Sequence, residues 1–169
     1  MKNIFVVTLL LILSCSKSDV DSKSKDNYSG FVFYEGLSTN YIQHGGLKRE
    51  YLLYIPPNLN NRENLPVIFN FHGYGDQALQ FFNQTDLIEI SDNNGVVLVY
   101  PQGSILPLGA SHWNAAPSSS SSTSFVNKSS TDDIGFFKVL LDEINQNNII
   151  DLNRVYVIGY SNGGMFSHF

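Results

Sequence analysis

The fold is decided by the stretch Val155-Tyr156-Val157-Ile158-Gly159-Tyr160-Ser161-Asn162-Gly163-Gly164. Its apolar first half predicts a buried strand over residues 155–160, and a helix is expected from Asn162 onward. Glycine two residues before and two residues after Ser161 avoids the collisions that side chains would make in a strained turn. Such a turn lifts the Ser161 hydroxyl above the sheet and places the Asn162 N–H beside it. A plain glycine-rich turn between a strand and a helix is the alternative interpretation.

A second glycine-rich segment, His72-Gly73-Tyr74-Gly75, directly follows the apolar run at residues 66–71. Where a serine turn of this kind performs acyl transfer, the loop after the corresponding strand donates a backbone N–H to the oxyanion. We assign that donor to Tyr74, acting together with the N–H of Asn162. Because His72 precedes Ser161 in the chain, we expect it to brace the loop rather than to act as the catalytic base. A generic turn would explain the same residues without chemistry.

Short apolar runs separated by turn residues surround these two segments. The pattern predicts strands at residues 31–37, 48–55, 66–71, 96–100 and 155–160, and helices at residues 84–93, after 131 and after 162. No helix is predicted between the first two strands, so we expect them to form an antiparallel hairpin at one edge. The alternation of buried strands with helices predicts an α/β fold with a mainly parallel, doubly wound sheet.

Residues 104–130 are predicted to form a long loop that contains the serine tract at residues 118–122. Thr131 and Asp132 suit the N-cap of the helix that follows. The carboxylates of Asp132 and Asp133 could be read as a catalytic pair. We expect a structural role instead, because acidic residues at a helix N-terminus bind its N–H groups and complement its dipole.

The composition excludes some classes of protein. The 169 residues carry a net charge of −5, one cysteine and four histidines. This length predicts one domain, and an acidic chain argues against nucleic acid as a partner. A single cysteine excludes a disulfide framework and a cysteine-clustered metal site within these residues.

The N-terminus predicts export. Residues 1–14 combine Lys2 with an apolar run shorter than the roughly 20 residues of a membrane-spanning helix, as in a signal peptide. The run ends in Leu13-Ser14-Cys15, which resembles the lipobox of bacterial lipoproteins. We therefore predict lipid attachment at Cys15 and a polar tether over residues 15–29, in a cell-envelope lipoprotein that meets the membrane only through its anchor. An ordinary secretory signal, with Cys15 as a bystander, is the alternative.

Five motifs follow one another along residues 30–169. They are His72-Gly73-Tyr74-Gly75, Tyr100-Pro101-Gln102-Gly103, Trp113-Asn114, Asp132-Asp133-Ile134-Gly135-Phe136 and Gly159-Tyr160-Ser161-Asn162-Gly163-Gly164-Met165. This order resembles the polyhydroxybutyrate depolymerase and feruloyl esterase family of α/β-hydrolases. The resemblance implies a serine esterase that forms an acyl-enzyme, with no metal and no organic cofactor. It matches Ser161 to the nucleophile and Asn162 to an oxyanion donor.

One departure from this family bears directly on activity. Its members place the catalytic Asp and His after the nucleophile, whereas this sequence ends eight residues past Ser161. We therefore expect residues 30–169 to be the N-terminal part of an α/β-hydrolase domain whose C-terminal part is missing, and these residues alone to be inactive. Neither His112 nor His168 is expected to replace the base.

The resemblance also predicts the class of substrate. It implies an ester, either of the polyhydroxyalkanoate type or a feruloyl or acetyl ester of a polysaccharide. A serine peptidase of the same fold is the alternative among enzymes, and a non-catalytic binding protein on a hydrolase scaffold is the alternative outside them. Trp113 could stack on the substrate or anchor its loop.

Overall fold

The computed structural model describes residues 34–57, 63–107, 109–115, 129–146 and 148–169. The predicted signal peptide, Cys15 and the tether lie outside these residues, as does the serine tract. Within the described ranges, no helix is long and apolar enough to cross a membrane.

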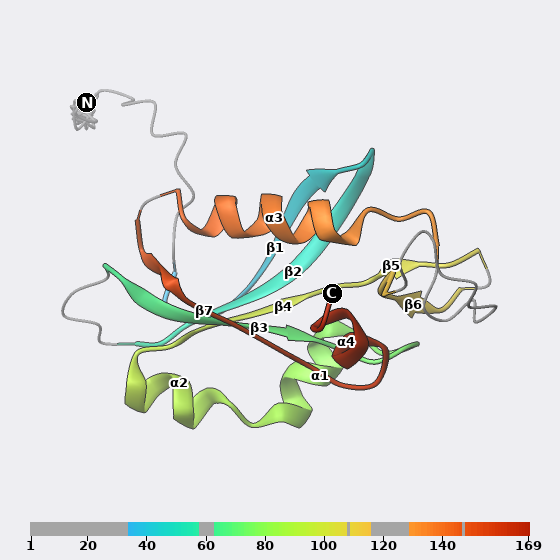
Figure 1. The fold of residues 1–169 in the computed structure, drawn as a ribbon. Coiled ribbons are helices and arrows are strands. Elements are labelled where there is room, and N and C mark those ends of the chain that lie inside the picture. The colour runs from blue at the N-terminus through green and yellow to red at the C-terminus, as the bar shows by residue number, and fades with distance from the viewer. Residues whose placement is uncertain (1–33, 58–62, 108, 116–128, 147) are drawn as a thin grey trace, which may run out of the picture.

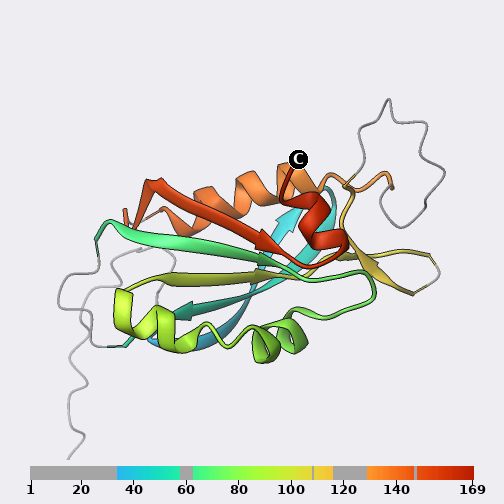
Figure 2. The ribbon, with the colours of Figure 1, turned by 60° about the horizontal axis from the view of Figure 1, so that its bottom comes forward.

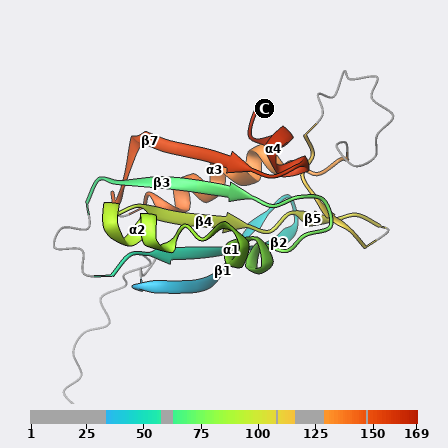
Figure 3. The ribbon, with the colours of Figure 1, turned by 90° about the horizontal axis from the view of Figure 1, so that it is seen from below.

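A five-stranded mixed sheet runs through the structure in the order β1-β2-β4-β3-β7 (Figure 1). Its strands are β1 (Gly36–His44), β2 (Leu47–Ile55), β3 (Leu65–Phe71), β4 (Val97–Pro101) and β7 (Ile150–Gly159). Strand β3 pairs in parallel with both β4 and β7, whereas β1 and β2 form an antiparallel hairpin at one edge (Figure 3). The predicted α/β architecture and its edge hairpin are therefore confirmed.

Helices cover both faces of the sheet (Figures 1 and 2). On one face, α1 (Ala78–Thr85) and α2 (Ile88–Asn94) connect β3 to β4; on the other, α3 (Asp133–Ile144) precedes β7. Successive side chains of a strand point to opposite faces. Accordingly, Val97 and Val99 of β4 belong to the apolar cluster under α3, and Leu98 and Tyr100 belong to the cluster under α1. Both faces of β4, the central strand of the sheet, are therefore buried.

The predicted bounds of two elements, a strand and a helix, are wrong. The strand expected at residues 31–37 begins only at Gly36 and runs to His44, because its half-buried and exposed positions alternate rather than forming an apolar run. The helix expected at residues 84–93 is two helices. Asp86, in the left-handed region at φ 49°, ends α1 and separates it from α2.

One later prediction is also corrected, and another is not. The strand predicted at residues 155–160 lies within β7, which is at the edge of the described sheet and leaves Tyr156 53% exposed, as expected for residues 30–169 alone. The loop expected at residues 104–130 contains two short antiparallel strands, β5 (Ser104–Ile105) and β6 (Ser111–His112). The buried Trp113 follows β6 directly, so this part of the segment belongs to the packed structure.

Candidate active site

The carboxyl ends of three parallel strands bring the candidate residues to one edge of the sheet. His72 directly follows β3, Gln102 directly follows β4, and Ser161 is the second residue after β7. Because these strands are neighbours and run in the same direction, the segments that follow them lie together (Figure 3). In open α/β sheets this edge is where ligands bind.

Ser161 occupies a strained turn between β7 and α4 (Asn162–Phe166). Its backbone lies at φ 50° and ψ −117°, a combination that side chains other than glycine rarely adopt. The residue is exposed, and its hydroxyl makes no hydrogen bond to any residue that the structure describes. The predicted turn is therefore present, with a serine hydroxyl held free at its tip.

Close backbone contacts explain the glycines on either side of Ser161. A Cβ atom on Gly159 would collide with the backbone of Gly163. One on Gly163 would collide with the carbonyl oxygens of Phe71 and His72. Only glycine lets α4 begin this close to the end of β3, which places the turn beside the His72 loop.

His72 braces the loop that follows β3. It is fully buried, with Nδ1 2.8 Å from the carbonyl oxygen of Gly73 and Nε2 accepting a hydrogen bond from the Gly103 N–H at 2.9 Å. Burial lowers the pKa of the ring, and its hydrogen bond to Gly73 together with the carboxylates of Asp76 and Asp133 partly opposes this shift. His72 is therefore a neutral structural histidine, as expected, and both of its nitrogens are occupied.

Trp113 anchors its loop rather than facing solvent. Its side chain is fully buried, and its Nε1–H donates to the carbonyl oxygen of His72 at 2.9 Å. Its ring stacks on Phe166 of α4 and meets Phe71 edge-on. The loop after β6 is thus fastened to both segments that carry the predicted oxyanion donors.

The two neighbouring aspartates have separate structural roles. Asp132 is the N-cap of α3 and accepts from the Gly135 N–H at 2.9 Å; this bond first, and then the contact with His44, lowers its pKa. Asp133 is buried in an ion pair with Arg49 (2.8 Å) and also accepts from the Asn114 N–H. Among the described residues, neither carboxylate is hydrogen-bonded to Ser161 or to the other aspartate.

None of the four histidines, all of them within the described ranges, is hydrogen-bonded to the Ser161 hydroxyl. His44 pairs with an aspartate at the start of α3. The ring nitrogens of His72 bond to Gly73 and Gly103, and those of His112 bond to Ser104 and Ser129. His168 is exposed just after α4. The described residues also contain no group of three or more His, Cys, Asp or Glu that could hold a metal ion.

Two polar residues to which the sequence analysis gave no role support the site. Arg49 is 4% exposed and donates to Asp133 and to the carbonyl oxygen of Gln102. The Gln102 side chain in turn reaches His72. A charged residue inside an otherwise apolar strand, and a polar residue directly after a buried parallel strand, are the signals that could have identified them.

A strained serine turn at the carboxyl edge of a mixed sheet is the hallmark of an α/β-hydrolase, and that is the fold of this chain. The S-formylglutathione hydrolase of Agrobacterium tumefaciens aligns with it at a TM-score of 0.62 and 16% identity. The alignment covers 83% of this chain and 54% of that one. The predicted fold class is therefore confirmed.

In sequence, the chain is similar to esterases. It is 28% identical over 129 residues to the bifunctional acetylxylan esterase/xylanase XynS20E of Neocallimastix patriciarum, and 28% identical over 116 residues to feruloyl esterase B of Thermothelomyces thermophilus. These matches cover 76% and 69% of this chain, but only 16% and 36% of the two relatives. They confirm the predicted resemblance to an esterase family. No protein-family model matches the chain.

Proposed function

We propose that the full-length protein is a serine carboxylic-ester hydrolase that acts through an acyl-enzyme, with Ser161 as its nucleophile. The observation that carries the proposal is the backbone of Ser161 at φ 50°, which presents an exposed hydroxyl at the ligand-binding edge of the sheet. Strain of this kind costs of order 1–3 kcal/mol, and it persists where function requires it.

In the proposed reaction, Ser161 Oγ forms a bond to the ester carbonyl carbon while its proton passes to a histidine. The tetrahedral intermediate then loses the alcohol, whose oxygen takes up that proton, and leaves an acyl-enzyme. Water repeats the two steps, releases the acid and restores the hydroxyl. We assign the oxyanion to the backbone N–H groups of Tyr74 and Asn162, each worth about 3 kcal/mol of barrier.

The proton acceptor in this proposal is a histidine that the 169 residues do not include. Support comes from the geometry of the four histidines present. His44, His72 and His112 are engaged in their own hydrogen bonds, and His168 has no bond to Ser161. A serine hydroxyl without an adjacent base is a weak nucleophile at neutral pH.

We propose feruloyl or acetyl esters of polysaccharides as the substrate class, because the two relatives are named for those activities. Polyhydroxyalkanoate-type polyesters are the second candidate class. Assays of full-length protein on methyl ferulate, p-nitrophenyl acetate, polyhydroxybutyrate and an aminoacyl p-nitroanilide separate these from a peptidase. We expect ester hydrolysis that Ser161→Ala abolishes. Anilide cleavage alone would indicate a peptidase, and no turnover would favour a binding protein.

We further propose that the protein is exported and lipid-anchored at Cys15. The motif Leu13-Ser14-Cys15 at the end of the apolar run supports this proposal. Cells expressing the protein should incorporate labelled palmitate into it and retain it in the membrane fraction, and Cys15→Ala should prevent both. Wild-type protein that is unlabelled and free in the medium would contradict lipid anchoring.

A further inference from the structure

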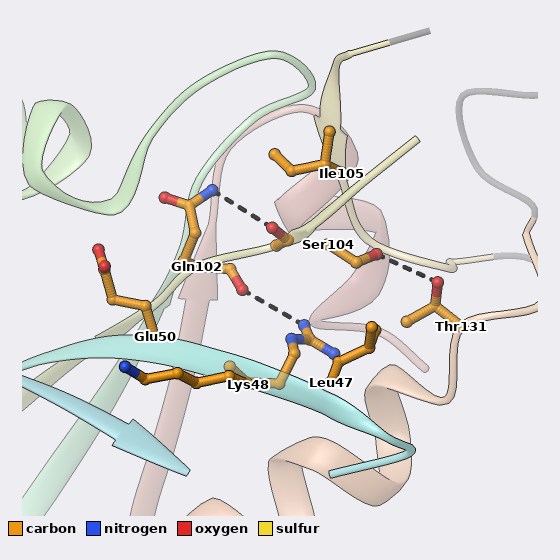
Figure 4. Close-up of a pocket in the computed structure, with 9 residues that line it drawn as sticks. Leu47, Lys48, Glu50, Gln102, Ser104, Ile105 and Thr131 are labelled. Carbon is orange, nitrogen blue, oxygen red and sulfur yellow. Dashed lines mark hydrogen bonds between the residues drawn. The ribbon is translucent and has the colours of Figure 1, made fainter. Parts of the chain in front are cut away.

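Gln102 joins the centre of the sheet to the loop after β3. It lies in the wall of an open cavity of about 300 Å³, next to Ser104 (Figure 4). Two hydrogen bonds hold its main chain. Its carbonyl oxygen accepts from the guanidinium of Arg49 at 3.3 Å, and its N–H donates to the backbone carbonyl oxygen of Glu50 at 2.9 Å. Both partners lie on β2, so the position of residue 102 follows that of the sheet.

The side-chain amide of Gln102 has one possible orientation. Its Oε1 accepts from the Ala78 N–H at 2.8 Å, which leaves Nε2 facing Nε2 of His72 at 3.1 Å. The reverse orientation would set the amide's NH₂ against the N–H of Ala78. Gln102 is therefore a donor toward His72.

This donor and the Gly103 N–H together define the tautomer of His72. Nε2 of the ring receives hydrogen bonds from the amide of Gln102 and from the N–H of Gly103, so it carries a lone pair. The single proton of the neutral ring then lies on Nδ1 and is donated to the carbonyl oxygen of Gly73.

The tautomer fixes the direction of the neighbouring amide. The carbonyl of Gly73 and the N–H of Tyr74 belong to one trans peptide unit, in which they point in opposite directions. The buried His72 ring holds that carbonyl, so the Tyr74 N–H is turned the other way. It makes no hydrogen bond to any residue in the described ranges, as an oxyanion donor requires.

We propose that Gln102 is a positioning residue, which acts through the tautomer of His72 to aim the Tyr74 N–H at the oxyanion. The oxyanion part rests on the proposed esterase function, whereas the tautomer part does not. Gln102→Glu tests both parts, because the new carboxylate is an acceptor that favours a proton on Nε2 of His72. Gln43→Glu, on the exposed face of β1, is the matched control.

The experiment measures the His72 ring by ¹⁵N NMR in the full-length protein, and kcat and KM on p-nitrophenyl acetate. Near neutral pH, wild type and Gln43→Glu should show an unprotonated Nε2, and Gln102→Glu a protonated one. In Gln102→Glu, kcat should fall about tenfold with KM little changed, because an oxyanion donor acts in the transition state.

An unchanged His72 ring in folded Gln102→Glu would overturn the proposal, and so would an altered ring with unchanged kcat. If Gln102→Glu fails to fold, Gln102→Met removes one of the two donors to Nε2 of His72 without adding charge. The fraction of neutral rings protonated on Nε2 should then rise and kcat should fall, both by less than in Gln102→Glu. Wild-type protein without ester hydrolysis would instead refute the esterase function, and the NMR result would still decide the tautomer.

Discussion

The side chain of Asn162 and the backbone of Trp113 hydrogen-bond to each other in both directions. The Trp113 N–H donates to Asn162 Oδ1 at 2.7 Å, and Asn162 Nδ2 donates to the Trp113 carbonyl oxygen at 3.0 Å. The Asn162 side-chain amide thus pairs with both the N–H and the carbonyl of Trp113, as the backbone of a neighbouring strand would. It ties the residue after the candidate nucleophile to the loop after β6.

Removing this pair should lower both stability and activity. Asn162→Ala leaves the N–H and the carbonyl of Trp113 unpaired in a buried setting, so we expect the free energy of unfolding to fall by about 2–3 kcal/mol. The control Asn94→Ala removes an exposed amide bonded only to its own helix and should cost about 0.5 kcal/mol or less. Urea unfolding of the full-length variants measures both. Equal losses would show that the pair is not structural.

Strain at Ser161 predicts a difference between two inactive variants. Ser161→Gly relieves the positive φ, whereas Ser161→Ala keeps it. We expect Ser161→Gly to unfold with a free energy about 1 kcal/mol higher than Ser161→Ala, even though glycine gives the unfolded chain more entropy. Denaturant titrations compare the two directly. A less stable glycine variant would contradict the strained turn.

The adjacent aspartates should respond very differently to the same substitution. Asp133→Asn breaks a buried ion pair and leaves Arg49 uncompensated, so we expect a loss of about 3 kcal/mol. Asp132→Asn keeps a side-chain oxygen at an exposed N-cap and should cost about 0.5 kcal/mol or less. Thermal or urea unfolding of the two variants checks this, and a similar loss in both would refute the assigned roles.

Buried tyrosines predict a loss of stability at alkaline pH. Desolvation, followed by the contact with Asp92, raises the pKa of Tyr54 to about 12, and burial raises the pKa of Tyr51 and Tyr100. Above about pH 10 the unfolded chain releases these protons while the native state keeps them, so the free energy of unfolding falls as the pH rises. Between about pH 9 and pH 11, Tyr54→Phe should reduce this dependence. An unchanged dependence in Tyr54→Phe would argue against its role.

The sequence predicted most of what local pattern determines. Apolar runs located β2, β3 and β4, and the glycine spacing around Ser161 located the turn. Helix capping located Asp132, since the side-chain acceptor and its N–H partner are only three residues apart. Each of these features depends on residues close in the chain.

The sequence did not predict features that depend on distant contacts. The order of the five strands follows from pairings between segments that are far apart in the chain, so local pattern alone does not determine it. The ion pair of Arg49 with Asp133 joins residues 84 positions apart. Gln102 acquires its role only through the fold, which brings His72 and Ala78 to its two amide atoms.

The most direct test of the account is to treat the full-length protein with a fluorophosphonate and locate the adduct by mass spectrometry. We predict one stoichiometric adduct, on the peptide that contains Ser161, together with complete loss of ester hydrolysis. Ser161→Ala should neither react nor hydrolyse esters, with a fall in kcat on the order of 10⁴-fold or more. An adduct on another residue, or ester hydrolysis that survives in Ser161→Ala, would contradict the assignment of Ser161 as the nucleophile.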